Sequence, residues 1–200
     1  MKKIFEYMRR MKEWVEGYAE KPHAQWILFL IAFAESSFFP IPPDVLLIAM
    51  AVTVPTKAFR YALICSAGSV LGGVFGYYIG WAFFETIGQP ILQFYGAMGH
   101  YETVRVLYNE HAFWAILSAA VTPIPYKVFT IAAGTFEVPL TTLIVASAIG
   151  RSARFFFIAG LFYFFGAPIK KFIDKYFEIL SVAFIVFLIG GFVVVRLFLR

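Results

Sequence analysis

The sequence predicts an all-α integral membrane protein with two inverted re-entrant helical hairpins, about three spanning helices and an N-terminal amphipathic helix. Three observations predict this fold: the apolar composition, two kinds of long apolar run, and the distribution of basic residues. Hydrophobic residues make up 61% of the 200 residues and charged residues only 14%, with a mean hydropathy of +0.78. Soluble domains carry about 25% charged residues. The composition therefore excludes a soluble domain, and the length suits a single membrane domain.

The first 22 residues predict an amphipathic helix that lies at the membrane surface. The stretch MKKIFEYMRRMKEWVEGYAEK is charged throughout and has no apolar core, so no cleavable signal peptide is expected. Ile4, Met8 and Trp14 fall roughly on one side of a helix, and basic residues lie elsewhere.

The apolar runs that follow are either continuous or broken by proline. Residues 58–84, 141–165 and 176–199 are long enough to cross a bilayer, which takes about 20 residues. Residues 24–55 and 112–139 are interrupted at PIPP and TPIPYK, by Pro40, Pro42, Pro43, Pro123 and Pro125. Proline ends a helix because it lacks a backbone donor. Each broken run leaves arms of about 10–15 residues, a length typical of re-entrant segments. We expect two hairpins that return to the side they entered, with two extra full spans as the alternative.

Basic residues indicate the orientation and divide the chain. They gather in 2–21, 57–60 and 170–175, whereas 85–111 carries only Arg105. Cytoplasmic loops are enriched in Lys and Arg, so we expect a multi-pass protein of the cell membrane with a cytoplasmic N-terminus. The expected units are the amphipathic helix 1–22, a first repeat 23–84, a connecting amphipathic segment 85–111, a second repeat 112–168 and a C-terminal transmembrane helix 169–200.

The two broken runs resemble each other. PIPPDVLLIA (40–49) and PIPYKVFTIA (123–132) share Pro, Ile, Pro, Val, Ile and Ala at matching positions. Each is followed by a predicted spanning helix with a glycine near its middle, Gly68 and Gly150. Because the hairpins enter from opposite sides, the halves form an inverted repeat. Secondary transporters use this arrangement to build a site at the bilayer midplane from interrupted helices.

The two halves differ in charge. The first carries Glu35 and Asp44, and the second carries Lys127, Arg151 and Arg154. An ionised side chain at bilayer depth costs at least about 2.5–3.5 kcal/mol, so such residues usually face a cavity or one another. We therefore expect one shared polar site between the halves.

Two interpretations of that site remain open. In the first, Lys127, Arg151 and Arg154 bind an anionic headgroup while Glu35 and Asp44 exchange protons. Burial disfavours an ionised carboxylate and a nearby cation favours it, so such an acid can titrate as its partner leaves. In the second, the acids form ion pairs with Arg151, Arg154 or Lys127 that only hold the halves together.

The remaining patterns have simpler interpretations. Small residues at a spacing of four let helices approach closely, which predicts helix packing for Gly68, Gly72, Gly76 and Gly80. The chain lacks GxSxG and HExxH motifs and an aspartate pair on facing spans, so we do not expect an enzyme. Three histidines far apart predict no metal site, and no cofactor is expected. The basic residues at the ends of apolar runs suit anionic lipids better than nucleic acid. A homo-oligomer is left open.

The acid followed by FFPIPPDVLL, the second hairpin TPIPYKVFTIAAG and the later GRSAR resemble the DedA family, also called the VTT or SNARE-associated membrane protein family. The resemblance covers roughly residues 24–166 and looks closest to the YqaA-like branch. It implies a multi-pass protein of the bacterial inner membrane with two opposed re-entrant hairpins.

The resemblance also implies a function. Family members are linked to flipping or scrambling of phospholipid or polyprenyl phosphate, and to transport driven by the proton-motive force. The family's functional acids fall on Glu35 and Asp44. The arginines that better-studied members carry around the second hairpin's proline are replaced here by Ala120 and Tyr126, and Lys127 is the expected substitute. We expect a transporter or lipid scramblase for an anionic headgroup, with proton coupling open; the alternative is a structural or assembly protein.

Overall fold

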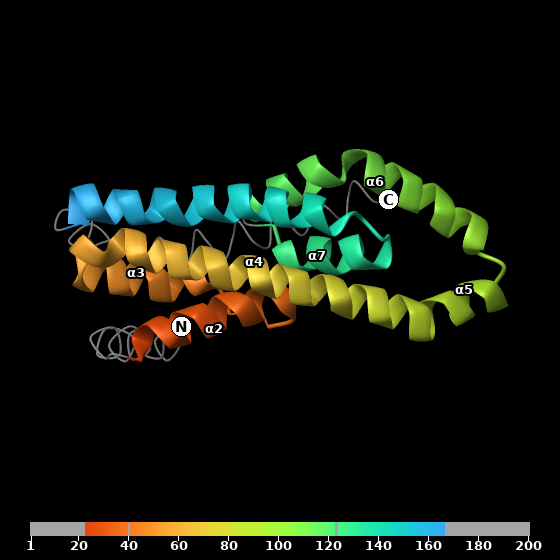
Figure 1. The fold of residues 1–200 in the computed structure, drawn as a ribbon, viewed down its shortest axis with the longest axis horizontal. Coiled ribbons are helices and arrows are strands. Elements are labelled where there is room, and N and C mark those ends of the chain that lie inside the picture. The colour runs from red at the N-terminus through yellow and green to blue at the C-terminus, as the bar shows by residue number, and fades with distance from the viewer. Residues whose placement is uncertain (1–22, 40, 123, 167–200) are drawn as a thin grey trace, which may run out of the picture.

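The computed structural model describes residues 23–39, 41–122 and 124–166. The expected helices within 1–22 and 169–200, together with Pro40 and Pro123, lie outside the described residues. Within the described ranges every regular element is helical (Figure 1). This agrees with the predicted all-α class.

The first broken run forms two short helices. α2 (Ala24–Ser37) has 14 residues and α3 (Pro43–Thr53) has 11, and a single 3₁₀ turn, η1 (Pro55–Lys57), follows. Pro42 caps α3 and Pro43 takes its first position, where a missing backbone donor costs nothing. At 1.5 Å per residue the two helices measure about 21 and 16 Å, short of the roughly 30 Å of a bilayer core.

A long helical stretch comes next. α4 (Ala58–Phe83) continues through a π-helical turn, η2 (Phe84–Gly88), into α5 (Gln89–Phe94). Residues 85–94 were expected to belong to the connecting amphipathic segment 85–111, but they prolong α4 instead (Figure 1). Pro90 lies just after the π turn, where the wider helix accommodates a residue without a backbone donor.

The second broken run also forms two helices, but they are unequal. α6 (Met98–Val121) has 24 residues, about 36 Å, which is longer than the predicted arm of 10–15 residues and long enough to cross a bilayer core. α7 (Tyr126–Thr135) has only 10 residues, about 15 Å, as predicted. The helix Leu140–Gly166 follows. The expected boundary between residues 111 and 112 does not coincide with a helix end, because α6 runs through it. No glycine or proline occurs from residue 100 to 122 to stop the helix earlier.

The two hairpins occupy opposite ends of the bundle. In Figure 1, α4 and the helix Leu140–Gly166 run side by side in opposite directions, and the bends of α2–α3 and α6–α7 lie near the middle. The candidate membrane spans of the described residues, by length and composition, are Pro55–Phe94 and Leu140–Gly166. The second matches the predicted run 141–165, whereas the first contains the predicted run 58–84 and continues to residue 94.

A stripe of glycines on α4 serves both hairpins. A Cβ at Gly68 or Gly72 would overlap the backbone carbonyls of Phe29 and Phe33 in α2, and one at Gly80 would overlap the carbonyl of Ile131 in α7. At Gly76 it would lie 2.6 Å from Oγ1 of Thr130 in α7. The helix Leu140–Gly166 uses Gly150 similarly, since a Cβ there would lie 2.6 Å from Ala120 of α6. Each long helix therefore packs a mid-helix glycine against the first arm of a hairpin.

Two apolar cores lie at the two ends of the bundle. One joins α2 and α3 to the start of α4 and to Phe155, Ala159 and Phe162. The other joins α6 and α7 to Val138, Leu143 and Ala146. Between them lie buried polar residues of several helices, namely Ser36, Ser37, Ser66, Ser69, Thr130, Ser147 and Arg151. A polar layer therefore crosses the bundle at the level of the hairpin bends.

At the end of the second hairpin that is remote from its bend, α6 contacts the turn that follows α7. The Tyr101 hydroxyl donates to the Thr135 carbonyl at 2.6 Å, Asn109 Nδ2 donates to the Phe136 carbonyl at 2.9 Å, and Arg105 pairs with Glu137. Burial raises the pKa of the Tyr101 phenol, so its hydroxyl remains a donor.

Candidate functional site

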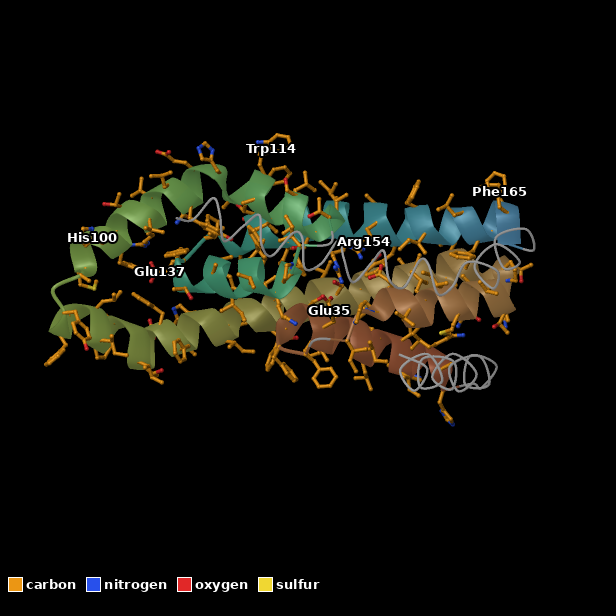
Figure 2. The ribbon with its side chains drawn as sticks, turned by 180° about the vertical axis from the view of Figure 1, so that it is seen from behind. Glu35, His100, Trp114, Glu137, Arg154 and Phe165 are labelled. Atoms are coloured by element: carbon orange, nitrogen blue, oxygen red, sulfur yellow. The ribbon has the colours of Figure 1, made fainter. Side chains whose placement is uncertain are left out.

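The charged side chains expected to form a site gather in the polar layer. Figure 2 shows Glu35 and Arg154 near the middle of the long axis, between His100 towards one end and Phe165 at the other. Glu35 lies in the last turn of α2, and Asp44 lies in the first turn of α3. Arg151 and Arg154 lie one turn apart near the middle of the helix Leu140–Gly166. The hairpin bend therefore delivers both acids to one face of a long helix.

The deeper of the two ion pairs joins Arg151 to Glu35. Their side chains are 2.7 Å apart and only 4% and 16% exposed. Arg151 Nε also donates to the Ser69 hydroxyl of α4, and the guanidinium lies over the rings of Tyr126 and Phe155, at 5.0 and 4.7 Å from their centres. These contacts hold the guanidinium from several sides.

The second ion pair joins Arg154 to Asp44 and is more open. Nε and Nη2 of Arg154 donate to the two carboxylate oxygens at 3.1 and 2.9 Å, a bidentate arrangement. Nη1 donates to the Thr122 carbonyl, the cap of α6, at 2.7 Å. The side chains of Arg154 and Asp44 are 22% and 16% exposed. Arg154 thus connects the bends of both hairpins.

Lys127 differs from the other cations of the site. Its Nζ donates to the Phe39 carbonyl in the bend of the first hairpin at 3.2 Å. In the described part of the chain no carboxylate pairs with it, since the two acids of the site are taken by the arginines. An ion pair between Lys127 and Asp44, one form of the structural interpretation, is therefore not what the structure has.

The bends themselves are tied together by polar contacts. The helix breaks leave carbonyls without a partner in their own helix, and side chains from other segments satisfy them. Thr130 of α7 donates to the Ser36 carbonyl at 3.2 Å, Lys127 to that of Phe39, and Arg154 to that of Thr122. Among the described residues no buried side-chain nitrogen or oxygen lacks a hydrogen-bond partner.

Three serines of the site, Ser36, Ser69 and Ser147, had not been singled out from the sequence. The hydroxyls of Ser36 and Ser69 are 2.6 Å apart beside Arg151, and the Tyr126 hydroxyl donates to Ser147. A signal for Ser147 exists, because it lies four residues before Arg151 and so shares its helix face. Ser69 directly follows Gly68 in the chain.

The arrangement can hold, exchange and neutralise charges. It presents two carboxylates, two guanidiniums and one ammonium at the meeting point of two helix breaks. In residues 23–39, 41–122 and 124–166, no cluster of three His, Cys, Asp or Glu side chains could hold a metal ion. Chemistry that these groups support includes binding of an anion by the cations and uptake of a proton by an acid that loses its partner.

Comparison with known proteins points in one direction. Residues 41–164 match the VTT domain. An uncharacterized protein of Haemophilus influenzae is 30% identical over 171 residues, covering 86% of this chain and 88% of its own length. A homologue of the uncharacterized protein HI0703 from Histophilus somni is 34% identical over 150 residues, covering 75% of this chain and 76% of its own. No solved structure matches the chain.

Proposed function

The chain belongs to the VTT domain family, also known as the DedA family, and on this basis we propose that it moves an anionic lipid headgroup past the central ion pairs. Family membership supports a membrane transporter or scramblase-like role in general. The observation that carries the specific proposal is the pair of salt bridges, Glu35–Arg151 and Asp44–Arg154, at the level where both hairpins bend.

A lipid environment accounts for the exterior of the bundle. Large apolar side chains are exposed along its length, among them Trp26 at 70%, Trp114 at 67%, Phe157 at 69% and Phe164 at 72%. Monomeric soluble proteins rarely expose extended apolar surface of this kind. With α4 and the helix Leu140–Gly166 as spans, the half-length helices α2, α3 and α7 are re-entrant arms, and the end with Lys57 and Arg60 faces the cytoplasm.

The site works by exchange of partners. An anionic headgroup that binds Arg154 displaces Asp44, and the released carboxylate takes up a proton because an unpaired charge at this depth is unfavourable. The pair Asp44–Arg154 suits this exchange because it is more open than Glu35–Arg151. Glu35 provides a second acid, and Arg151 and Lys127 add positive charge to the path. Departure of the headgroup lets Asp44 release its proton and pair again.

Reconstitution tests the proposal. Proteoliposomes carrying a fluorescent anionic phospholipid report translocation when dithionite quenches the outer leaflet. We expect Asp44→Asn and Arg154→Ala to insert normally and to lose most of the translocation of the parent. The control is Arg105→Ala, which removes a cation from the outer end of the bundle. Parental rates in both site variants would contradict the site assignment.

Reversal of the pair distinguishes transport from a purely structural role. The double variant Asp44→Arg with Arg154→Asp keeps an ion pair between α3 and the long helix. A structural or assembly protein should tolerate the reversal, whereas a transport site should not, because the cation then lies on α3 and no longer contacts the Thr122 carbonyl at the bend of the second hairpin. A pH gradient across the same vesicles tests proton coupling: coupling predicts that the translocation rate of the parent changes with the gradient, and a rate that does not change contradicts it.

A further inference from the structure

Asp44 and Lys127 occupy equivalent positions in the two hairpins. Each is the second residue of the helix that follows a proline-rich bend, after Pro42 and Pro43 in α3 and after Pro125 in α7. A carboxylate there is favourable, because the N-terminus of a helix carries partial positive charge. An ammonium at the same position is unfavourable. The partial positive charge at the N-terminus of α3 is therefore balanced by Asp44, whereas at the N-terminus of α7 Lys127 adds a second positive charge.

The charges of the polar layer do not balance. Arg151 pairs with Glu35, and Arg154 pairs with Asp44. Among the described residues of the cluster, the positive charge of Lys127 therefore has no negative counterpart. A net charge at bilayer depth is costly, so it normally finds a counter-charge. Among the described residues, the contact that Lys127 makes is with the dipole of the Phe39 carbonyl. Within residues 23–39, 41–122 and 124–166, the cluster thus carries one more positive than negative charge.

The N–H donors of Arg154 already form hydrogen bonds and Arg151 is buried, whereas Lys127 has N–H donors to spare for a ligand. Arg154 uses Nε and Nη2 on Asp44 and Nη1 on Thr122, and Arg151 is 3% exposed. An ammonium has three donors, and Lys127 uses one of them on a carbonyl. An incoming anion can therefore contact Lys127 without first breaking an ion pair, which makes Lys127 the first contact of the site.

Exposed apolar side chains occur on both segments that meet at this ammonium. The bend that supplies its carbonyl partner carries Phe38, Phe39 and Ile41, exposed at 60%, 44% and 47%, and the next residue of α7, Val128, is exposed at 57%. A cation with an apolar rim suits a ligand whose anionic head adjoins hydrocarbon. A small free anion has no hydrocarbon part that could pack against these apolar side chains.

From these observations we infer that Lys127 is the docking cation for a singly charged phosphodiester headgroup of a lipid. The inference rests on the proposed function and narrows its substrate. A phosphodiester carries one negative charge and so neutralises the cluster. A phosphomonoester, such as phosphatidic acid or a polyprenyl phosphate, carries up to two near neutral pH and leaves an excess negative charge.

Three lipids that share their acyl chains test the inference: fluorescent phosphatidylglycerol, phosphatidic acid and phosphatidylcholine. They carry a diester with one net charge, a monoester, and no net charge. We expect the parent to translocate phosphatidylglycerol about tenfold faster than phosphatidylcholine, the ratio that corresponds to one favourable charge contact, and faster than phosphatidic acid. Lys127→Gln should bring phosphatidylglycerol down to the phosphatidylcholine rate, and Lys127→Arg should retain the preference.

Lys57→Gln is the matched control, since Lys57 is an exposed lysine at the end of the bundle. Its three rates should equal those of the parent. An unchanged ratio of phosphatidylglycerol to phosphatidylcholine in Lys127→Gln would overturn the inference while leaving the proposed function standing. A preference for phosphatidic acid in the parent would overturn the assignment of a singly charged headgroup.

A binding measurement separates failure of the inference from failure of the proposed function. Short-chain phosphatidylglycerol is titrated against the purified protein in a zwitterionic detergent, and the thermal stability is followed. Stabilisation of the parent but not of Lys127→Gln supports the docking role, even for a parent that translocates no lipid. Equal stabilisation of both overturns it. Dimethyl phosphate has the same anion without tails, and equal affinity for it would show that the apolar rim plays no part.

Discussion

At the scale of single residues, the two ion pairs differ in burial and in how many partners they have. The Arg151 guanidinium is enclosed by an acid, a serine hydroxyl and two aromatic rings, whereas Arg154 is partly open and also binds the bend of the second hairpin. Removing one member of a buried ion pair lowers stability by more than the net contribution of the pair, because the remaining charge stays desolvated. The two arginines should therefore respond differently to substitution.

The first prediction concerns Arg151. Arg151→Ala leaves Glu35 without its counter-charge and is expected to lower stability by about 3–5 kcal/mol. Arg105→Ala, at a pair that is 34% and 45% exposed, is expected to cost less than about 1 kcal/mol. Thermal unfolding in detergent, followed by size-exclusion chromatography, measures both.

A double variant separates charge from packing at Arg151. Glu35→Gln combined with Arg151→Gln removes both charges and should recover part of the loss, because no desolvated ion remains. If the double variant is as unstable as Arg151→Ala, packing against Tyr126 and Phe155 is the main contribution of Arg151, and the electrostatic account is wrong.

At the scale of elements, among the helices α2 to α7, α4 packs most extensively against α2 and then α7. The contacts are close because glycines replace side chains where backbone meets backbone. Gly72 faces the Phe33 carbonyl and Gly80 faces the Ile131 carbonyl, and neither backbone can move without shifting its helix. Since α2 carries Glu35 and α7 carries Lys127, these contacts also set the geometry of the site.

The second prediction concerns these glycines. Gly72→Ala and Gly80→Ala each force a helix away from α4 and are expected to destabilise the protein by about 1–3 kcal/mol, the usual cost of overpacking. Gly160→Ala is the matched control, because nothing lies within 4 Å of the added Cβ. It should gain about 0.5–1 kcal/mol, since alanine favours a helix interior over glycine. Equal thermal stability of all three variants would refute the packing role of the stripe.

At the scale of the whole molecule, two apolar cores enclose a polar layer, and each hairpin belongs to one core. The bends of the hairpins lie near the middle of the bundle (Figure 1). The segment that joins α3 to α4 and the segment that joins α5 to α6 lie at opposite ends (Figure 1). In a bilayer this arrangement would place the ion pairs far from bulk water on both sides. It also predicts which of the segments between helices lie on the same side of the membrane.

The third prediction concerns that topology. For a re-entrant first hairpin, His23 and Thr56 lie on the same side of the membrane and His100 on the other. Cysteine at each position, introduced singly, is treated with an impermeant maleimide in intact cells and in permeabilised cells. His100→Cys should react in intact cells, and His23→Cys and Thr56→Cys only after permeabilisation. Cys65 is buried and should give little background. Labelling of His23→Cys and Thr56→Cys from opposite sides would require full spans.

Much of the fold could be predicted because it depends on local patterns. Proline placement predicted both helix breaks, and the apolar runs 58–84 and 141–165 predicted the long helices to within one or two residues at most of their ends. Continuation of α4 into α5, and of α6 across residue 111, was not predicted. A π turn and a helix without breakers leave little trace in hydropathy.

By itself, the sequence determined the all-helical class, the positions of the helix breaks and the five charges of the site, since each follows from residue type and spacing along the chain. Only the tertiary structure decided the pairing: Glu35 with Arg151, Asp44 with Arg154, and Lys127 with a carbonyl instead of an acid. Partners 110 or 116 residues apart meet because two helix bends converge. Such convergence depends on how whole helices pack, and no local pattern encodes which of several opposite charges will be nearest.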